Sequence, residues 1–310
     1  MNTSVIRVEG IRKQFRGQEV LKGVSFEVQS GQTFAFLGRN AAGKTTLIRM
    51  LLGLLAPDAG SVSILGINPR TNPLAVRRRV GYLAEDQKMF GWMTVEQIVR
   101  FIAPFYDAWD DALADQYLNQ FELPRQTKIR HLSKGQNVRL GLVLALAHRP
   151  EVVILDDPVL GLDPIMRKEF NRDLIAHLQG EGRTVLYSSH LLYEVEPVAD
   201  AVGILHQGQI VRQGPTEELR EQVKRLLVPA AALGRLHGLT VLDAAPAGDR
   251  TALTVDNASE AIAVLHQIGV EPEIVDLNLD EIFEAFVIGR PEIPAGRGGI
   301  AVPAATQAAR

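Results

Sequence analysis

The sequence predicts an α/β protein built on a mostly parallel sheet with helices on both faces. Four apolar runs have the length of buried strands: Thr33–Leu37, Glu151–Leu155, Thr184–Tyr187 and Ala201–Leu205. Helical patterns at Lys44–Leu55 and Pro164–Gln179 lie between these runs. Strands that alternate with helices pair in parallel, because each helix carries the chain back to the start of the next strand.

Two regions depart from this alternation. Residues 3–66 contain short β-rich runs broken by turns, such as Val5–Val8 and Val24–Val28. Residues 86–148 are mainly helical in pattern, with helix stops at Pro104 and Pro124.

The chain changes character after about residue 220, which predicts a small α+β domain. β-like runs at Leu239–Leu242 and Thr251–Val255 flank a turn. A helix is expected to begin at Asn257, with Glu260 as its capping-box partner.

A strand at Ile274–Leu277 and a helix at Leu279–Val287 complete this predicted C-terminal domain over residues 221–290. Residues 291–310 are rich in Pro, Gly and Ala, which predicts a disordered tail.

The composition excludes several classes of protein. The chain of 310 residues has a formal net charge of -3 and no cysteine, so it forms no disulfide or cysteine-based metal site. The near-neutral balance argues against nucleic acid as a partner. No secretory signal is evident, and the longest apolar runs, near Met50–Ala56 and Leu140–Ala147, fall short of the ~20 residues that span a bilayer. We therefore expect a soluble protein.

A glycine-rich turn after the first buried run fits the phosphate-binding P-loop. Its sequence is Gly38-Arg39-Asn40-Ala41-Ala42-Gly43-Lys44-Thr45, with Thr46 next along the predicted helix. Such a turn points backbone N–H groups inward, and the helix N-terminus adds a positive dipole end. Lys44 can reach the β- and γ-phosphates, and the Thr45 hydroxyl can bind Mg²⁺. We expect these residues to bind ATP.

The second buried run ends in two carboxylates, Asp156 and Asp157. A strand that ends in Asp delivers its charge to the carboxyl edge of a parallel sheet, where ligands bind in such folds. Asp156 is a candidate Mg²⁺ ligand, mainly through water. Many strands end in Asp, so this pattern alone does not indicate an ATPase. It does so here because a P-loop precedes it by ~110 residues.

The segment Leu132-Ser133-Lys134-Gly135-Gln136 lies between these two elements and precedes a helical run. Ser133 is a natural N-cap, and Gly135 lets a phosphate approach the backbone. The segment resembles the signature sequence of the ATP-binding-cassette (ABC) family. Over about Val5–Pro215 the resemblance implies a P-loop NTPase (RecA-like) core, an antiparallel β subdomain and a helical signature subdomain, all within residues 1–220.

Three further residues occupy positions that are functional in this family. Phe15 lies where an aromatic stacks on adenine, and Asp163 of Gly161-Leu162-Asp163 lies in a loop that crosses to the partner subunit. His190 of Ser188-Ser189-His190 resembles the switch histidine that contacts the γ-phosphate. Each has a plainer alternative: a packed phenylalanine, an ordinary turn and a structural histidine.

Three departures from the family pattern concern the site. Glu85 replaces a glutamine that senses Mg²⁺ and the transport partner, and its carboxylate can still coordinate Mg²⁺. Lys134 replaces a usual glycine. Asp157 replaces the glutamate that orients the attacking water, and a misplacement of about 1 Å can lower a rate about a hundredfold. We hypothesise that Asp157 is the base and that turnover is slow; the alternative is a site that binds ATP and barely hydrolyses it.

The resemblance implies a head-to-tail dimer that encloses two ATP molecules, each between Lys44 of one chain and Ser133 of the other. A homodimer and a heterodimer with a second ABC ATPase both remain open. A separate transmembrane permease subunit is implied, which docks on the zone Met89–Ala103; plain core packing of the aromatics in this zone is the alternative. The protein is then expected in the cytoplasm, peripheral on the inner face of the cell membrane.

The segment Leu279–Phe283 resembles the C-terminal extension of prokaryotic drug- and antibiotic-export cassettes, so we expect an exporter. Two other functions remain. A non-transport ABC ATPase acting in translation or on DNA usually has two cassettes, a coiled-coil insert or zinc cysteines. A regulatory ATP-binding module with negligible turnover would fit the substitution at Asp157.

Overall fold

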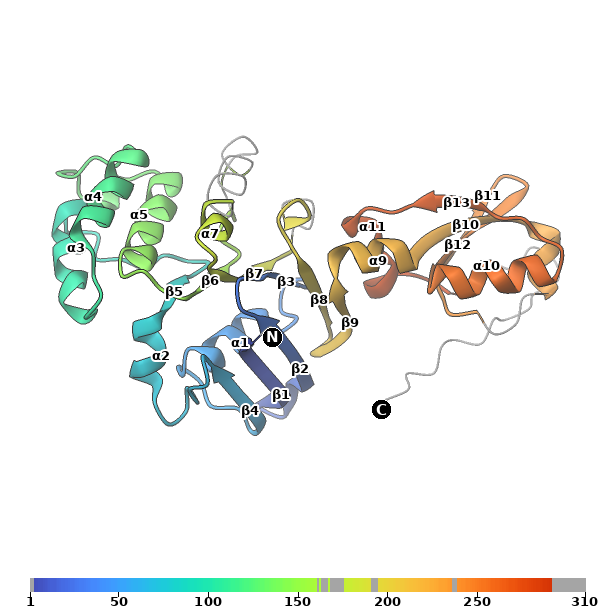
Figure 1. Cartoon of the computed structure of the whole chain (residues 1–310), viewed down its shortest axis with the longest axis horizontal. Coiled ribbons are helices and arrows are strands. Elements are labelled where there is room, and N and C mark those ends of the chain that lie inside the picture. The colour runs from blue at the N-terminus through green and yellow to red at the C-terminus, as the bar shows by residue number, and fades with distance from the viewer. Residues whose placement is uncertain are drawn as a thin grey trace. The chain divides into compact units, whose positions relative to one another are not determined.

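The computed structural model describes residues 3–160, 162, 167, 176–190, 195–235 and 239–291. The chain divides into two compact units, Met1–Gln213 and Gly214–Arg310 (Figure 1). Most of the predicted helix Pro164–Gln179 and residues 292–310 of the predicted tail lie outside the described residues.

The first unit contains a six-stranded sheet in the order β5-β6-β7-β3-β8-β9. Its parallel strands are β3 (Thr33–Leu37), β5 (Val80–Leu83), β6 (Val152–Asp156), β7 (Thr184–Ser189) and β8 (Ala201–His206). Every residue of β3, β6 and β7 is buried, as expected for strands covered on both faces. The predicted α/β core is confirmed.

Strand β9 (Gln209–Pro215), which the sequence did not predict, extends the sheet beyond β8. Gln207 and Gly208 alone separate the two strands, and both have positive φ, 48° and 83°. Two left-handed central residues define the type I′ turn, whose twist matches that of a hairpin. The backbone N–H of Lys22 donates to the Gly208 carbonyl at 2.8 Å, so this turn is also bound to the second sheet.

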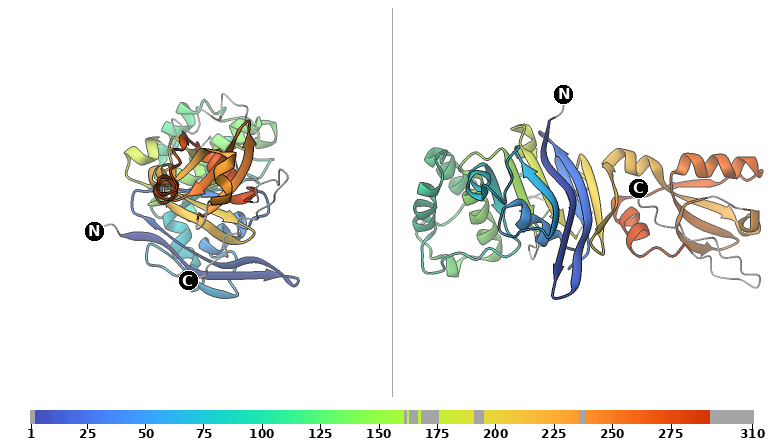
Figure 2. Two further views of the ribbon diagram at one scale, coloured as in Figure 1. Left: turned by 90° about the vertical axis from the view of Figure 1, so that its right-hand side faces the viewer. Right: turned by 90° about the horizontal axis from the view of Figure 1, so that it is seen from below.

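The second sheet is antiparallel, with the order β2-β1-β4. Strands β1 (Ser4–Phe15) and β2 (Gln18–Gln29) pair along their length with several register shifts, and β4 (Ala59–Ile64) pairs with β1. These strands are longer than the short runs predicted, because cross-strand pairing continues through polar residues that carry no β signal. Figure 2 shows β1 and β2 in dark blue and β4 in lighter blue beside the parallel sheet.

Aromatic packing joins the two sheets. The ring of Phe26 on β2 stacks on Phe34 and Phe36 of β3, each with centroids 5.3 Å apart. Helix α1 (Lys44–Leu51) contributes its apolar face to the same core. The helix ends earlier than the predicted Leu55, because Gly53 adopts a positive φ of 66° directly after its C-cap.

The helical region comprises α2 (Pro73–Arg79), α3 (Val95–Ile102), α4 (Asp111–Gln120) and α5 (Lys134–Leu146), with short 3₁₀ turns at Ala103–Phe105 and Ile129–His131. The N-caps of the last three helices accept hydrogen bonds with their side chains: Thr94, Asp110 and Ser133. The predicted stop at Pro104 follows α3 directly.

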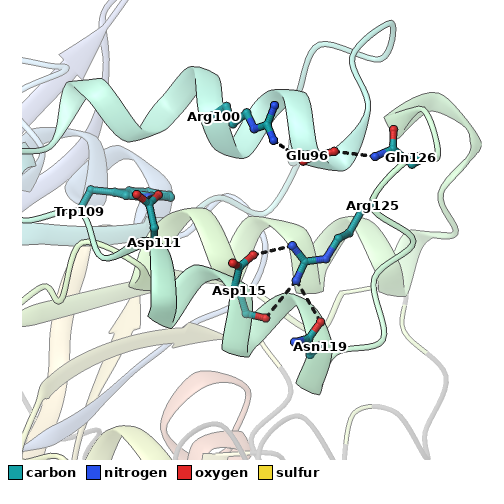
Figure 3. A network of polar contacts seen from close by, with 8 residues as sticks. All are labelled: Glu96, Arg100, Trp109, Asp111, Asp115, Asn119, Arg125 and Gln126. Carbon is teal, nitrogen blue, oxygen red and sulfur yellow. Dashed lines mark hydrogen bonds and ion pairs between the residues drawn. The ribbon is translucent and has the colours of Figure 1, made fainter.

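A polar network binds α3 and α4 to the loop after α4 (Figure 3). On α3, Glu96 contacts Arg100 and the loop residue Gln126, both at 2.6 Å. The loop residue Arg125 donates to Asp115 at 2.5 Å and to Asn119 at 3.0 Å on α4. The four ion-paired side chains are 30–78% exposed, so the network orders the loop more than it stabilises the fold.

The second unit is a four-stranded antiparallel sheet with helices. Its elements are α9 (Thr216–Gln222), β10 (Val223–Pro229), a 3₁₀ turn (Ala230–Arg235), β11 (Val241–Ala247), β12 (Arg250–Asp256), α10 (Ala258–Gln267), β13 (Glu273–Asp276) and α11 (Leu279–Val287). The sheet order is β11-β12-β10-β13. Helix α10 packs Ala261 and Leu265 against Leu226 and Leu253 of the central strands.

The predicted capping box at Asn257 is wrong. Helix α10 does follow Asn257, but this residue has a left-handed backbone with φ 78°, and its side chain accepts no cap hydrogen bond. Its amide instead donates to the Glu260 carboxylate at 2.9 Å. Reciprocal capping needs an extended N-cap backbone, which Asn278 before α11 has.

Among the described residues, no helix has both the length and the apolar character needed to cross a bilayer.

We predict that Gly208→Ala destabilises the first unit by about 2–4 kcal/mol, because a Cβ there would lie 2.4 Å from the Val20 carbonyl oxygen. Gly17→Ala is the control, since Gly17 has φ 86° but open space around it, and strain alone should destabilise it by about 1 kcal/mol. Urea unfolding followed by tryptophan fluorescence measures this unit, since Trp92 and Trp109 are the two tryptophans of the chain. Equal losses in the two variants would contradict the predicted clash.

A second prediction concerns His148, which is buried and stacks on Tyr106 with ring centroids 4.0 Å apart. Burial lowers the pKa of His148 from 6.5 to about 4, so between these values the unfolded chain binds a proton that the folded chain does not. The free energy of unfolding should therefore decrease as the pH is lowered, by about 2 kcal/mol between pH 7 and pH 5 relative to the His148→Phe variant. Parallel unfolding curves for the two proteins at both pH values would show that His148 does not contribute.

Candidate functional site

The glycine-rich loop connects β3 to α1, as predicted. Its two flanking glycines are required by close contacts: a Cβ on Gly38 would lie 2.8 Å from the Leu205 carbonyl oxygen, and one on Gly43 would lie 2.7 Å from Leu21. Gly43 also has φ 113° as the N-cap of α1. The loop therefore lies tightly between the two sheets, with the N-terminus of α1 at its end.

Ala41 occupies a left-handed backbone position, with φ 65°. An alanine Cβ disfavours this region by roughly 1–2 kcal/mol, which glycine avoids. The loop geometry holds Ala41 there, because Ala42 on one side donates its N–H to the Arg39 carbonyl at 3.1 Å. Strain of this kind is characteristic of functional loops.

Lys44 is a buried cation, with 6% of its side chain exposed. Its ammonium group donates to the Gly38 carbonyl at 2.7 Å and lies 3.4 Å from the Asp157 carboxylate. A buried charge is tolerated when it is paired and hydrogen-bonded. The positive charge is therefore fixed inside the loop.

Asp156 ends β6 and is completely buried. Its Oδ1 accepts a hydrogen bond from the Ser188 hydroxyl at 2.7 Å, whereas Oδ2 has no hydrogen-bond partner among the described residues. Burial raises the pKa of Asp156, and the hydroxyls of Ser188 and Thr45 oppose that rise. A buried carboxylate oxygen without a partner, beside a threonine hydroxyl, suits a hard cation such as Mg²⁺.

Asp157 binds His190 through a short contact. Its Oδ1 lies 2.7 Å from His190 Nδ1 and also accepts the His190 backbone N–H at 3.1 Å. Asp157 has φ 43° and is held by its own N–H, which donates to the Ser188 carbonyl and hydroxyl, both at 3.1 Å. The strand pair β6–β7, which sets Asp156 opposite Ser188, produces all these contacts.

A cavity of about 540 Å³ opens beside the loop. Its lining comprises Arg39, Asn40, Ala41, Ala42, His190, His206 and Gln207. Asp157 is not among the lining residues and is 7% exposed. The pKa of His206 is lowered by partial burial and by the charges of Arg39 and Lys22.

The remaining predicted residues lie outside this cluster. Glu85 is exposed in the segment after β5, and Phe15 ends β1 with 43% of its surface exposed and Lys13 Nζ 5.4 Å from its ring centroid. Asp163 lies outside the described residues.

The signature residues form the start of α5. Ser133 and Gln136 make a reciprocal capping box, with Gln136 N to Ser133 Oγ at 3.2 Å and Ser133 N to Gln136 Oε1 at 3.0 Å, and Gly135 is buried. Among the residues that the structure describes, no hydrogen bond or ion pair joins them to the loop Gly38–Thr45.

Sequence reasoning missed the part played by Ser188. This buried side chain contacts both Asp156 and the Asp157 backbone. The sequence shows Ser188 two residues before His190. Its hydrogen-bond partners depend on which strand lies next to β7, and no local sequence pattern predicts that neighbour.

A glycine loop between a buried strand and a helix, a lysine inside the loop and a carboxylate on the neighbouring strand end together define the class of P-loop nucleotide-binding proteins. A protein-family model described as "ABC transporter" matches residues 21–160.

Proteins similar in sequence point to the same family. The bacitracin transport ATP-binding protein BcrA of Bacillus licheniformis is 34% identical over 227 residues, which cover 73% of this chain and 74% of BcrA. The daunorubicin resistance ATP-binding protein DrrA3 of Streptomyces coeruleorubidus is 33% identical over 91% of this chain and 96% of its own. A solved ATP-binding subunit of an ABC transporter superposes with a TM-score of 0.65 at 29% identity, over 71% of this chain and 93% of that one.

The chain belongs to the ABC transporter family, as one of its ATP-binding, ATP-hydrolysing subunits. Proteins of this kind dimerise and work with transmembrane permease subunits.

We predict that Ala41→Gly stabilises the first unit by about 0.5–1 kcal/mol, since relief of the strain at φ 65° outweighs the extra freedom of the unfolded chain. Ala42→Gly is the matched control and should destabilise the unit, because Ala42 packs against the core. Tryptophan-monitored urea unfolding measures both. A lower stability for Ala41→Gly would show that the alanine is not strained.

Proposed function

We propose that this chain binds ATP with Mg²⁺ at the cluster of Lys44, Asp156, Asp157 and His190, and that hydrolysis there drives a permease that exports small antibiotic-like compounds. The observation that carries the proposal is the convergence of these four side chains, from α1, β6 and the end of β7, beside the glycine loop. The loop residues Gly38 to Thr45, with Thr46, would hold the phosphates through backbone N–H groups.

Mg²⁺ fits the residues present. Asp156 offers its unpartnered Oδ2 and Thr45 its hydroxyl, and Mg²⁺ commonly takes only one or two protein ligands beside water and phosphate oxygens. No group of three or more His, Cys, Asp or Glu side chains suited to a metal occurs among the described residues, so a closed protein cage is absent from that part of the chain. When bound, the ion would neutralise charge on the β- and γ-phosphates. Glu85 is a further candidate ligand.

We propose that the second half of each site comes from a partner subunit. Ser133, Gly135 and Gln136 begin a capped helix whose N-terminus is suited to a phosphate, yet they make no hydrogen bond to their own loop. In the same proposal, Asp163 belongs to the loop that crosses to the partner subunit, and Phe15 stacks on adenine. Either a second copy of this chain or another ABC ATPase could supply these groups.

An exposed aromatic patch is our candidate for the permease contact. Phe90, Trp92, Phe101 and Phe105 are 42–64% exposed, and their rings pack on one another with centroids 5.6–6.1 Å apart. Exposed aromatic surface of this kind marks a partner interface more often than a free surface. The contact would place the protein on the inner face of the cell membrane.

The relatives support export as the direction. BcrA is named for bacitracin transport and DrrA3 for daunorubicin resistance. A match over 91% of this chain includes part of the second unit, so the similarity to DrrA3 is not confined to the ATPase region. We accordingly assign the ATPase to residues 1–220 and an accessory role to residues 221–290.

The test is retention of ATP by the purified full chain with Mg²⁺. Lys44→Ala should weaken binding by about 10- to 100-fold, because the charge-assisted contact of the ammonium group is lost. Lys224→Ala, which removes an ion pair with Asp276 in the second unit, is the matched control and should bind as the wild type does. Equal binding by Lys44→Ala and wild type, or no binding by wild type, would contradict the proposed function.

A further inference from the structure

Phe15 is the last residue of β1, directly before a two-residue turn to β2. Its Cα partner across the hairpin is Gln18, and the turn residues Arg16 and Gly17 have positive φ of 48° and 86°. Two successive left-handed residues form the tight I′ turn that fixes the ends of a hairpin. The backbone therefore holds Phe15 in one place, while 43% of the residue stays exposed.

The same hairpin packs on the glycine-rich loop. Leu21 of β2 lies opposite Lys13 of β1, and a Cβ on Gly43 would lie 2.7 Å from the Leu21 side chain. The carbonyl oxygen of Val20 would be 3.3 Å from the same Cβ. A nucleotide with its phosphates in the loop would therefore have this hairpin as its neighbour, with Phe15 two residues beyond Lys13.

Lys13 is fixed beside the Phe15 ring. Its side chain is 13% exposed, and Nζ donates to Asp58 Oδ1 at 2.7 Å and to the Ala56 carbonyl at 2.9 Å. The same ammonium group lies over the Phe15 ring, 5.4 Å from the ring centroid. A cation in this position is attracted to the negative face of an aromatic ring. One face of Phe15 is therefore occupied by a charge that would lose two hydrogen bonds if it moved away.

Asp58 fixes the segment that leads into Phe15. Its Oδ2 accepts the backbone N–H of Gln14 at 2.7 Å, and its own N–H donates to the Arg12 carbonyl at 2.9 Å. The hydrogen bonds from Lys13 and Gln14 hold the pKa of Asp58 below its usual value, so the carboxylate stays charged near neutral pH. Three consecutive residues of β1 are thus bound to this one aspartate.

We infer that Lys13 and Asp58 are positioning residues for the nucleobase: Asp58 holds the Lys13 ammonium group over one face of the Phe15 ring, and the base stacks on the other face. The inference rests on the proposed function, in which Phe15 stacks on adenine, and adds the pair of residues that orients the ring. A ring already held in its stacking orientation loses less side-chain freedom when the base binds, so affinity rises without a new contact to the nucleotide.

A double-mutant cycle on the full chain with Mg²⁺ tests the inference, with the Kd for ATP measured for Phe15→Ala, Lys13→Met and the double variant. We expect Phe15→Ala to raise the Kd by about 10-fold and Lys13→Met to raise it by about 3- to 10-fold. The double variant should bind no more than about twofold more weakly than Phe15→Ala, because Lys13 then has no ring to position. Methionine keeps an unbranched apolar stem at this position and removes the charge with its hydrogen bonds.

Three further measurements separate positioning from general damage to the hairpin. Asp58→Asn should raise the Kd for ATP about as much as Lys13→Met does, because the charge that holds the ammonium group is lost. Arg12→Met removes an ion pair with Glu19 on the same hairpin and should bind ATP as wild type does. Inorganic triphosphate has no base, so its Ki as a competitor of ATP should be the same in wild type and in Lys13→Met.

The inference is overturned if Phe15→Ala or Lys13→Met binds ATP as tightly as wild type, if their losses multiply in the double variant, or if the Ki of triphosphate rises as far as the Kd for ATP. A loss in Arg12→Met equal to that in Lys13→Met would also overturn it, since any damage to the hairpin would then suffice. In each case wild-type retention of ATP stands. A wild-type chain that retains no ATP, as in the Lys44 test, would instead contradict the proposed function itself.

Discussion

Strands β6 and β7 pair in parallel from Val152 opposite Thr184 to Asp156 opposite Ser188, and the candidate functional cluster depends on this register. The register places the Ser188 hydroxyl on the Asp156 carboxylate and the Asp157 backbone on Ser188. His190 then follows at the end of β7 within 2.7 Å of Asp157. A slip of one residue would turn each side chain to the opposite face of the sheet and separate the carboxylates from their partners.

The cluster also balances buried charge. Lys44 and Asp157 are buried and lie 3.4 Å apart, and either side chain alone would be an uncompensated charge in the interior. Asp156 is different, because burial raises its pKa and one of its oxygens has no hydrogen-bond partner. In the proposed site, Asp157 is paired with Lys44 and His190, and the unpartnered Oδ2 of Asp156 is the oxygen available to a cation.

The short side chain of Asp157 has a contact in the folded chain that the sequence did not reveal. As a sequence feature it suggested a base that stands too far from its water, and hence slow hydrolysis. In the folded chain the short carboxylate lies against His190, whose ring lines the cavity.

The sequence by itself determined the buried strands, the glycine loop, the strand-end carboxylates and the capped helix at Ser133, because each of these is a local pattern set by chain neighbours. It did not determine the length of β1 and β2, the presence of β9 and β10, or the left-handed Asn257, since these depend on pairing partners and backbone geometry far along the chain. The contact of Asp157 with His190 spans 33 residues, and only the order of strands in the sheet brings the two together. Local chemistry thus identified the residues, whereas the tertiary structure decided which of them touch, because hydrogen bonds between strand ends exist only after the sheet has formed.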